Sequence, residues 1–270
     1  MPAKASRFFL ALPLLLAIGC GPKWFLAGCD REIERGTKAI EAAKDDGERA
    51  LAHLQRAHGY AEKARYSKAF KLIEAAEYER LFALAIADHD RAIELAPDKT
   101  QVYYSRGRTH FDRAFLEDPA APQFLAALEN AEADLTNAVE RDQRNADALD
   151  LLGVVHTSMN ELDAAIVDFT RVMALDRHLG KLRLSETYCS RGSAHQQAGE
   201  YETAIADYEK AIELGTLVHG CDCQPDSPLA WIYYEQKQYD KSWEVVARAR
   251  RAHRWIQPEL VAQLEDVSPR

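Results

Sequence analysis

The sequence contains few of the residues that break helices and no pattern typical of strands. Only 13 glycines and 10 prolines occur among its 270 residues, whereas the helix-favouring alanine, glutamate, leucine and arginine recur throughout. Extended runs that alternate apolar and polar residues are absent, which argues against strands. Hydrophobic residues make up 47% of the chain, so a packed core is possible. The sequence therefore predicts an all-α fold.

A basic surface is also missing. The formal net charge is −9, and no stripe of lysine or arginine offsets it. Nucleic-acid binding needs a basic face for the phosphates, so the sequence argues against a nucleic-acid partner.

Signatures of catalysis are absent as well. The chain has no glycine-rich phosphate loop, no His-Glu-x-x-His helix and no nucleophile elbow. Acidic residues are many, as in "AEADLTNAVERD" and "ETAIADYEKAIE". We expect them on solvent-facing helix positions, where Glu/Lys pairs four residues apart solvate the surface. We therefore predict no catalytic residue, no cofactor and no metal ligand, and a protein that is not an enzyme.

Long apolar runs are absent except at the N-terminus. There Lys4 and Arg7 precede an apolar run from Phe8 to Ile18, which is the pattern of an export signal over residues 1–19. The run is too short for a membrane-spanning helix, which needs about 20 apolar residues. Removal of the signal takes away two basic and no acidic residues, which shifts the net charge from −9 to −11.

The end of this segment resembles a bacterial lipoprotein cleavage box. "LAIGC" ends at Cys20, which the resemblance makes the lipidated first residue of the mature chain, followed by a tether over 20–30. "FLAGC" ends at Cys29 and is an alternative, with the signal ending at residue 28, although Lys23 interrupts the apolar run before it. An ordinary cleaved signal without lipid is a further alternative. We expect an exported, membrane-tethered protein that faces the periplasm.

The rest of the chain repeats one sparse skeleton of residues. "LGVVHTSMNELDAAIVDFTRVMALD" begins at Leu152 and "RGSAHQQAGEYETAIADYEKAIELG" begins 39 residues later at Arg191. Glycine in the first helix allows the paired helix to approach closely, and an aromatic residue in the second fills the space between them. The matching positions are Gly153/Gly192, His156/His195, Leu162/Tyr201, Ala165/Ala204, Phe169/Tyr208 and Val172/Ala211.

This skeleton resembles the tetratricopeptide repeat, a helix–turn–helix unit of about 34 residues. The resemblance implies a right-handed superhelical array of antiparallel helix pairs, an α-solenoid, with units at about 66–99, 100–145, 146–184, 185–220 and 221–252. The largest insertion falls in residues 112–123. We expect an irregular helical hairpin over 31–65 before the array, with "KDDGE" as its turn. A capping helix and tail over 253–270 should cover its last face.

The resemblance also implies a non-enzymatic module that binds a protein or peptide on its concave face. Family members that grip a C-terminal carboxylate use a lysine and asparagine set that this sequence lacks, so that ligand is not carried over. Counting from the start of each unit, the side chains expected on the concave face are Gln101, Tyr104, Arg108, Asp112, Asp150, Val154, Thr157, Ser193, Gln196 and Gln197.

Three histidines, His110, His156 and His195, hold the same position in successive units. Stacked helices lie about 8–10 Å apart, whereas a zinc ion needs its ligands within about 2.1 Å. The three rings cannot share an ion, so we interpret them as packing residues.

"HGCDCQPDSP" offers other functions. A metal-binding or enzymatic protein with chemistry near His219, Cys221 and Cys223 is one alternative. An oxidising compartment instead favours a disulfide from Cys189 to Cys221 or Cys223, and the sequence leaves the pairing open. A second alternative is a small-ligand or glycan binder that uses the aromatic side chains of Tyr104, Trp231 and Tyr233.

Overall fold

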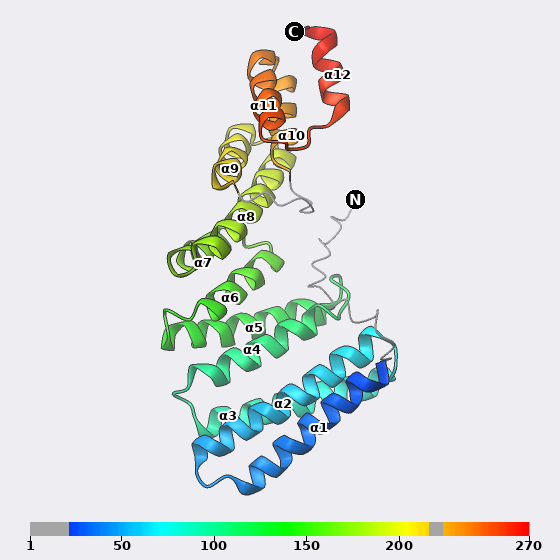
Figure 1. Ribbon diagram of the computed structural model, residues 1–270, viewed down its shortest axis with the longest axis vertical. Coiled ribbons are helices and arrows are strands. Elements are labelled where there is room, and N and C mark those ends of the chain that lie inside the picture. The colour runs from blue at the N-terminus through cyan, green and yellow to red at the C-terminus, as the bar shows by residue number, and fades with distance from the viewer. Residues whose placement is uncertain (1–21, 216–223, 270) are drawn as a thin grey trace. The chain divides into compact units, whose positions relative to one another are not determined.

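The computed structural model describes residues 22–215 and 224–269, which divide into two compact units between Met159 and Asn160. Twelve helices and no strand occur in these residues (Figure 1), so the predicted all-α fold of antiparallel helix pairs is confirmed. Among the described helices, none has the length and apolar character to span a bilayer. Residues 1–19 and Cys20 lie outside the described part.

The first unit contains six helices. They are α1 (Pro22–Ala42), α2 (Asp46–Ala69), α3 (Ala75–Leu95), α4 (Thr100–Ala114), α5 (Pro122–Arg141) and α6 (Ala146–Ser158). Each packs on its neighbour in sequence, and α4 also lies against α2. Helix α1 occupies nearly all of the predicted tether 20–30. The predicted unit 66–99 begins inside the last turn of α2, whereas the hairpin in the structure is the whole of α2 with α3.

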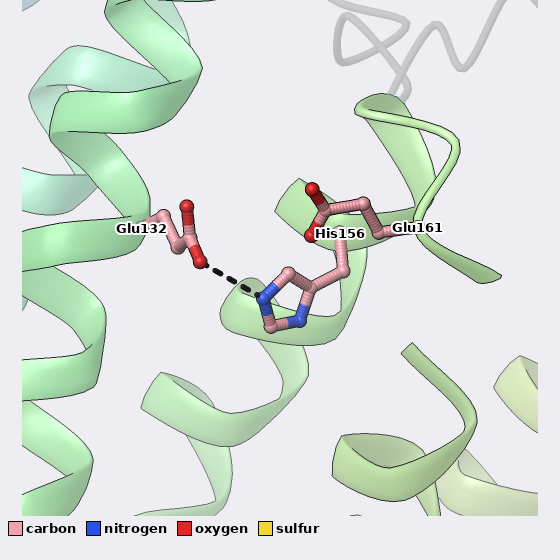
Figure 2. A group of neighbouring side chains, drawn as sticks. All are labelled: Glu132, His156 and Glu161. Atoms are coloured by element: carbon pink, nitrogen blue, oxygen red, sulfur yellow. Dashed lines mark ion pairs between the residues drawn. The ribbon is translucent and has the colours of Figure 1, made fainter. Parts of the chain in front are cut away.

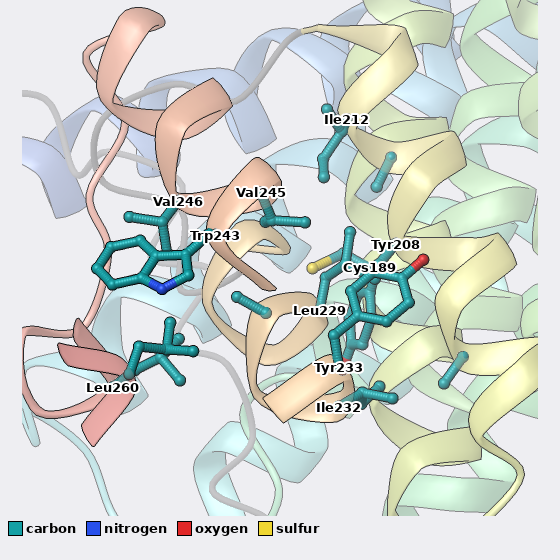
Figure 3. Packing of buried hydrophobic residues seen from close by; sticks show 14 residues of the cluster. Cys189, Tyr208, Ile212, Leu229, Ile232, Tyr233, Trp243, Val245, Val246 and Leu260 are labelled. Carbon is teal, nitrogen blue, oxygen red and sulfur yellow. The ribbon is translucent and has the colours of Figure 1, made fainter. Parts of the chain in front are cut away.

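The second unit contains the other six. They are α7 (Leu162–Leu175), α8 (Arg177–Ala198), α9 (Tyr201–Leu214), α10 (Asp226–Glu235), α11 (Tyr239–Arg251) and α12 (Pro258–Val267). The predicted unit 146–184 spans the boundary at Met159, so its two helices are described with their own units. Helix α12 covers α10 and α11 (Figure 3): Leu260 is fully buried near Trp243, whose Nε1 donates to the Ser268 carbonyl at 2.8 Å.

The glycine positions of the skeleton are points of close helix approach. A Cβ on Gly192 would lie 3.0 Å from two ring carbons of Tyr208, and one on Gly107 would lie 3.0 Å from Leu135 Cγ. A larger side chain at either position would require the facing side chain to shift. The expected reason for these glycines is therefore confirmed.

Three turns each have a residue in the left-handed conformation at the same position. Asn160, Gly199 and Lys237 each lie seven residues after the close-approach position, with φ of 64°, 80° and 59°. Glycine adopts this left-handed conformation without cost, asparagine tolerates it, and lysine is disfavoured there. The turn geometry is thus kept even where the sequence no longer favours it.

An arginine in the first helix of three hairpins binds a buried aspartate in the second. We call this pair the Arg–Asp brace. In α4 and α5, Arg106 Nε and Nη2 donate to the Asp134 carboxylate at 2.8 and 2.6 Å. The same two-bond pairing joins Arg56 to Asp88 and Arg191 to Asp207. The three aspartates are buried. The prediction that the acids of these stretches face solvent is therefore wrong for Asp134 and Asp207, because an arginine compensates their burial.

Two braces also reach the preceding helix. Arg106 Nη1 donates to Asp90 of α3, and Arg191 Nη1 donates to Asp163 of α7. Each of these arginines thus holds two carboxylates at once and joins neighbouring hairpins within its unit. Five donor hydrogens in one plane allow this, which a lysine could not reproduce.

The hairpins of the first unit are longer than those of the second. Twelve residues separate Gly192 from Ala204, but 24 separate Gly107 from Ala131 and 28 separate Ala57 from Ala85. The insertion predicted at 112–123 accounts for one of these extensions. The other lengthens α2 and α3, and the missing glycine at Ala57 hid it from sequence analysis.

His89 fills the aromatic position of the α2–α3 hairpin, the equivalent of Tyr208. Its ring is 2% exposed, and Nε2 lies 2.9 Å from Thr109 Oγ1, whose hydroxyl donates to the Ser105 carbonyl. The other nitrogen, Nδ1, is buried without a hydrogen-bond partner among the described residues. Burial lowers the pKa of His89 to about 3, so the folded protein keeps this ring neutral.

We predict that removing the buried aspartate of a brace lowers the free energy of unfolding much more than removing the exposed aspartate that the same arginine binds. Asp134→Ala leaves Arg106 without its buried partner and should lower the free energy of unfolding by about 3 kcal/mol. Asp90→Ala removes a half-exposed carboxylate from the same arginine and should cost less than about 1 kcal/mol. Chemical unfolding followed by circular dichroism measures both, and equal losses would contradict the brace.

We also predict that His89 makes the protein less stable in acid. The unfolded chain binds a proton at this residue below pH 6.5, whereas the folded chain does so only near pH 3. Stability is therefore lost as the pH falls between these values, with a slope of up to about 1.4 kcal/mol per pH unit. His89→Phe should flatten the slope and the exposed His178→Asn should not. Unfolding measured at pH 6.5 and pH 4.5 tests this, and an unchanged slope in His89→Phe would refute it.

Candidate interaction surface

Four predicted surface residues lie on one face of α4. Gln101, Tyr104, Arg108 and Asp112 recur every three or four residues, which is the spacing of one helical face. Gln101 and Arg108 are exposed, while Tyr104 and Asp112 are half-buried. The Gln101 amide donates to Ser105 Oγ at 3.1 Å. The face therefore carries polar side chains within reach of a partner.

Asp112 places this face next to α2. Burial raises the pKa of its carboxyl group, and the positive charges of Arg65 and Arg108 oppose that rise. Arg65 is itself held by Glu62, with Nη2 donating at 2.7 Å. Residues from α2 and α4 thus form one charged surface.

Helix α6 continues this surface within the first unit. It contacts α4, and its predicted residues Asp150, Val154 and Thr157 are half-buried. The Thr157 hydroxyl donates to the Gly153 carbonyl at 2.8 Å, so its own helix satisfies it. The first helices of successive hairpins, α2, α4 and α6, therefore lie in a row. We call their outward side the first-helix face of this unit.

The predicted residues of the second unit lie in the last turns of α8. Gln196 Oε1 accepts a hydrogen bond from the Tyr208 hydroxyl at 2.9 Å, which fixes it to the hairpin. Gln197 is exposed and its amide donates to Ser193 Oγ at 3.3 Å. Of the three, Gln197 is the most available to a ligand.

Sequence analysis missed the part of the surface on α2. His58 is exposed, and Glu62 and Arg65 are half-buried on the helix that the predicted hairpin 31–65 placed outside the array. The sequence did contain a signal that α2 is the first helix of a hairpin: Arg56–Ala57 in α2 matches Arg106–Gly107 in α4.

The three aligned histidines each have their own surroundings. His156 Nε2 lies 3.4 Å from Glu132 in the first unit (Figure 2). Glu161, also labelled there, belongs to the second unit. His195 Nδ1 lies 2.6 Å from Glu200, and burial lowers the pKa of His110.

The residues of the two alternative functions are differently placed. His219, Cys221 and Cys223 lie outside the described residues. Cys189 is fully buried and disulfide-bonded, but the predicted pairing stays a prediction.

For an aromatic binding site, Tyr233 is buried in the core of the second unit (Figure 3). Trp231 is half-buried, and its Nε1 donates to Gln257. Tyr233 is therefore not accessible to a ligand, whereas Trp231 is partly accessible.

We predict that the Asp112 charge lowers stability. A carboxyl group with a raised pKa disfavours the folded state once it ionises, so the loss sets in as the pH rises above 3.8. At pH 7, Asp112→Asn should therefore raise the free energy of unfolding by roughly 0.5 kcal/mol. The exposed Asp98→Asn should leave it unchanged. Thermal unfolding measures both, and a destabilised Asp112→Asn would mean that the carboxylate supports the fold.

Solved structures with the same kind of fold include a crystal structure of MamA, which aligns over 66% of this chain and 94% of its own at 20% identity and a TM-score of 0.42. BtubC from P. vanneervenii aligns over 86% and 91% at 13% identity and a TM-score of 0.48. The human IFIT1 dimer with PPP-AAAA aligns over 77% and 54% at 15% identity and a TM-score of 0.38. At these values the likeness is one of fold alone.

No curated protein sequence matches the chain. The family model of the tetratricopeptide repeat matches residues 185–214, which span most of α8 and all of α9. The matched segment contains Gly192, Ala204 and Tyr208, the residues at which the two helices meet. In residues 185–214, this chain is therefore similar to a tetratricopeptide repeat.

Proposed function

We propose that the chain is a non-enzymatic interaction module that docks a partner protein or peptide of the bacterial cell envelope. Tetratricopeptide repeats generally serve protein binding, which supports the general role. We place the binding surface on the first-helix face of the first unit. A row of parallel-lying helices presents many side chains on one continuous wall.

Arg108 is the observation that carries the proposal. It is exposed in the middle of the first-helix face and makes no ion pair with any described residue. Arg106 of the same helix, by contrast, is bound to two carboxylates. Arg108 thus has no ion-pair partner in the described part of the chain, and it lies near Asp112, whose ionised carboxylate lowers stability. Together they suit a partner that carries both positive and negative charges.

We further propose that the protein is exported and tethered by a lipid on Cys20, facing the periplasm. The basic residues, apolar run and "LAIGC" sequence of the N-terminus support this. Cys29 is the weaker site, because it lies inside α1 and is 7% exposed. Cleavage before Cys29 would also remove Phe25, whose ring lies 4.4 Å from that of Tyr66.

The burial of Cys29 supports the same choice. Burial raises the pKa of its thiol to about 11, so the reactive thiolate is scarce at neutral pH. A buried thiol within a helix is a packing residue, whereas a lipid-bearing cysteine has to be free at the end of the mature chain.

The test is photocrosslinking in living cells from a benzoylphenylalanine at position 108. We expect one envelope protein to be captured repeatedly. The same probe at Thr136, exposed on α5 of the same hairpin, should not capture it. Capture of the same proteins from both positions, or of none from position 108, would overturn the docking surface.

Mass spectrometry of the mature N-terminus tests the anchor separately. We expect an acylated Cys20 as the first residue. An unmodified chain that starts elsewhere would refute the lipid anchor and leave the docking surface to the crosslinking result.

A further inference from the structure

Two helix ends and two connections of the first unit gather at one end. Helix α1 begins there, α2 ends there, and the α2–α3 turn and the α4–α5 loop lie on the same side (Figure 1). Direct contacts join them: the ring of Phe25 packs on Tyr66, and Lys68 Nζ donates to Glu117 at 2.8 Å. Leu116 packs on the buried cluster around Tyr78. This end consists largely of the extensions that lengthen the first two hairpins.

Large apolar side chains are exposed at this end. Trp24 is 58% exposed, Leu72 43%, Phe115 45% and Leu125 48%. We call these four residues the apolar tip. They come from four different segments: the start of α1, the α2–α3 turn, the end of α4 and the start of α5. In the first unit, Leu51 is the one other large hydrophobic residue of the described part that is this exposed. Single exposed apolar residues are common, but four at one end indicate a surface that something covers.

The charged groups behind the apolar tip are neutralised. Lys68 pairs with Glu117, and Arg113 pairs with Glu79 at 2.7 Å. Lys71, Glu74 and Asp118 are exposed in the two connections and carry one positive and two negative charges. The end therefore exposes four large apolar side chains among a few charged ones whose net charge is small. That composition suits the boundary between headgroups and acyl chains better than a strongly charged partner.

The position of the proposed anchor identifies the occupant. Cys20 lies two residues before α1 in the sequence, and two peptide units span at most about 7 Å. A lipid on Cys20 would hold the start of α1, and with it Trp24, at the membrane surface. Tryptophan is the residue most typical of that interface.

We propose that the apolar tip is a membrane seat: its four side chains enter the bilayer surface beside the lipid on Cys20. The proposal rests on the lipid anchor of the proposed function. The anchor fixes the distance from the membrane, and the seat fixes the orientation of the first unit. A helix that follows the anchor almost directly, in place of a long tether, allows the seat to reach the bilayer.

The test is the quenching of tryptophan emission by brominated lipids. The full chain, processed by its host and purified with its lipid, is reconstituted into phosphatidylethanolamine–phosphatidylglycerol vesicles with bromine on the acyl chains. We expect quenching relative to unbrominated vesicles, and Trp24→Phe should abolish it. Trp255→Phe is the matched control, because Trp255 is 53% exposed but lies in the second unit. It should leave the quenching unchanged.

A second variant keeps the tryptophan and weakens the seat. Leu72→Ser combined with Phe115→Ser should reduce the quenching of Trp24 while circular dichroism shows an unchanged helix content. Equal quenching in wild type and Trp24→Phe, or none in either, would overturn the seat even if mass spectrometry finds Cys20 acylated. If Cys20 is unmodified, the lipid anchor fails, and the same vesicles decide the seat: quenching of Trp24 in the unmodified chain retains it, and its absence refutes it.

Discussion

A carboxylate buried between two helices requires a fixed positive charge, and three hairpins of this protein supply it with an arginine from the first helix. Asp88, Asp134 and Asp207 are 3–4% exposed. Burial of an unpaired carboxylate is prohibitive, so each hairpin can close only in the register that brings its arginine alongside. The two parallel hydrogen bonds of each pair also fix the rotation of one helix about the other. Close approach at Gly107 and Gly192 follows directly from that register.

The last hairpin shows what replaces the brace when it is absent. Leu229 and Val245 stand in α10 and α11 where the arginine and aspartate would be, and both are buried. Asp226 at the start of α10 pairs instead with Arg254 beyond α11, at 2.7 Å. Apolar packing can substitute for a buried ion pair, and here it coincides with the hairpin that α12 covers. Helix α12 therefore covers the apolar side of that hairpin, whereas the hairpins with a brace keep polar faces that other molecules can contact.

The sequence allowed the fold class and the matched repeat to be predicted, because Gly192, Ala204 and Tyr208 stand in ideal positions for close helix contact. It did not reveal the α2–α3 hairpin. Ala57 takes the glycine position and His89 the aromatic position, and a 28-residue spacing replaces twelve.

Sequence analysis also misread the acids of α5 and α9. Asp134 and Asp207 lie among solvating charges in the sequence, and only pairing with an arginine on another helix distinguishes them. Such pairing is a tertiary property, which local periodicity does not contain. The α2 side of the candidate surface, with Arg65 and Glu62, was missed for another reason: Ala57 replaces the glycine that marks the equivalent position in α4 and α8.

The lengthened hairpins connect the architecture with its use. The brace of the α4–α5 hairpin lies beside Gly107. The residues added between Gly107 and Ala131 are not needed for it, so they can serve another purpose. They place Phe115 and Leu125 at the end where α1 begins. A repeat of minimal length, such as α8–α9, lacks this extension. The charged first-helix face and the apolar tip thus lie on the same set of packed helices. A partner bound to the face would then be held at a set height above whatever surface covers the apolar end.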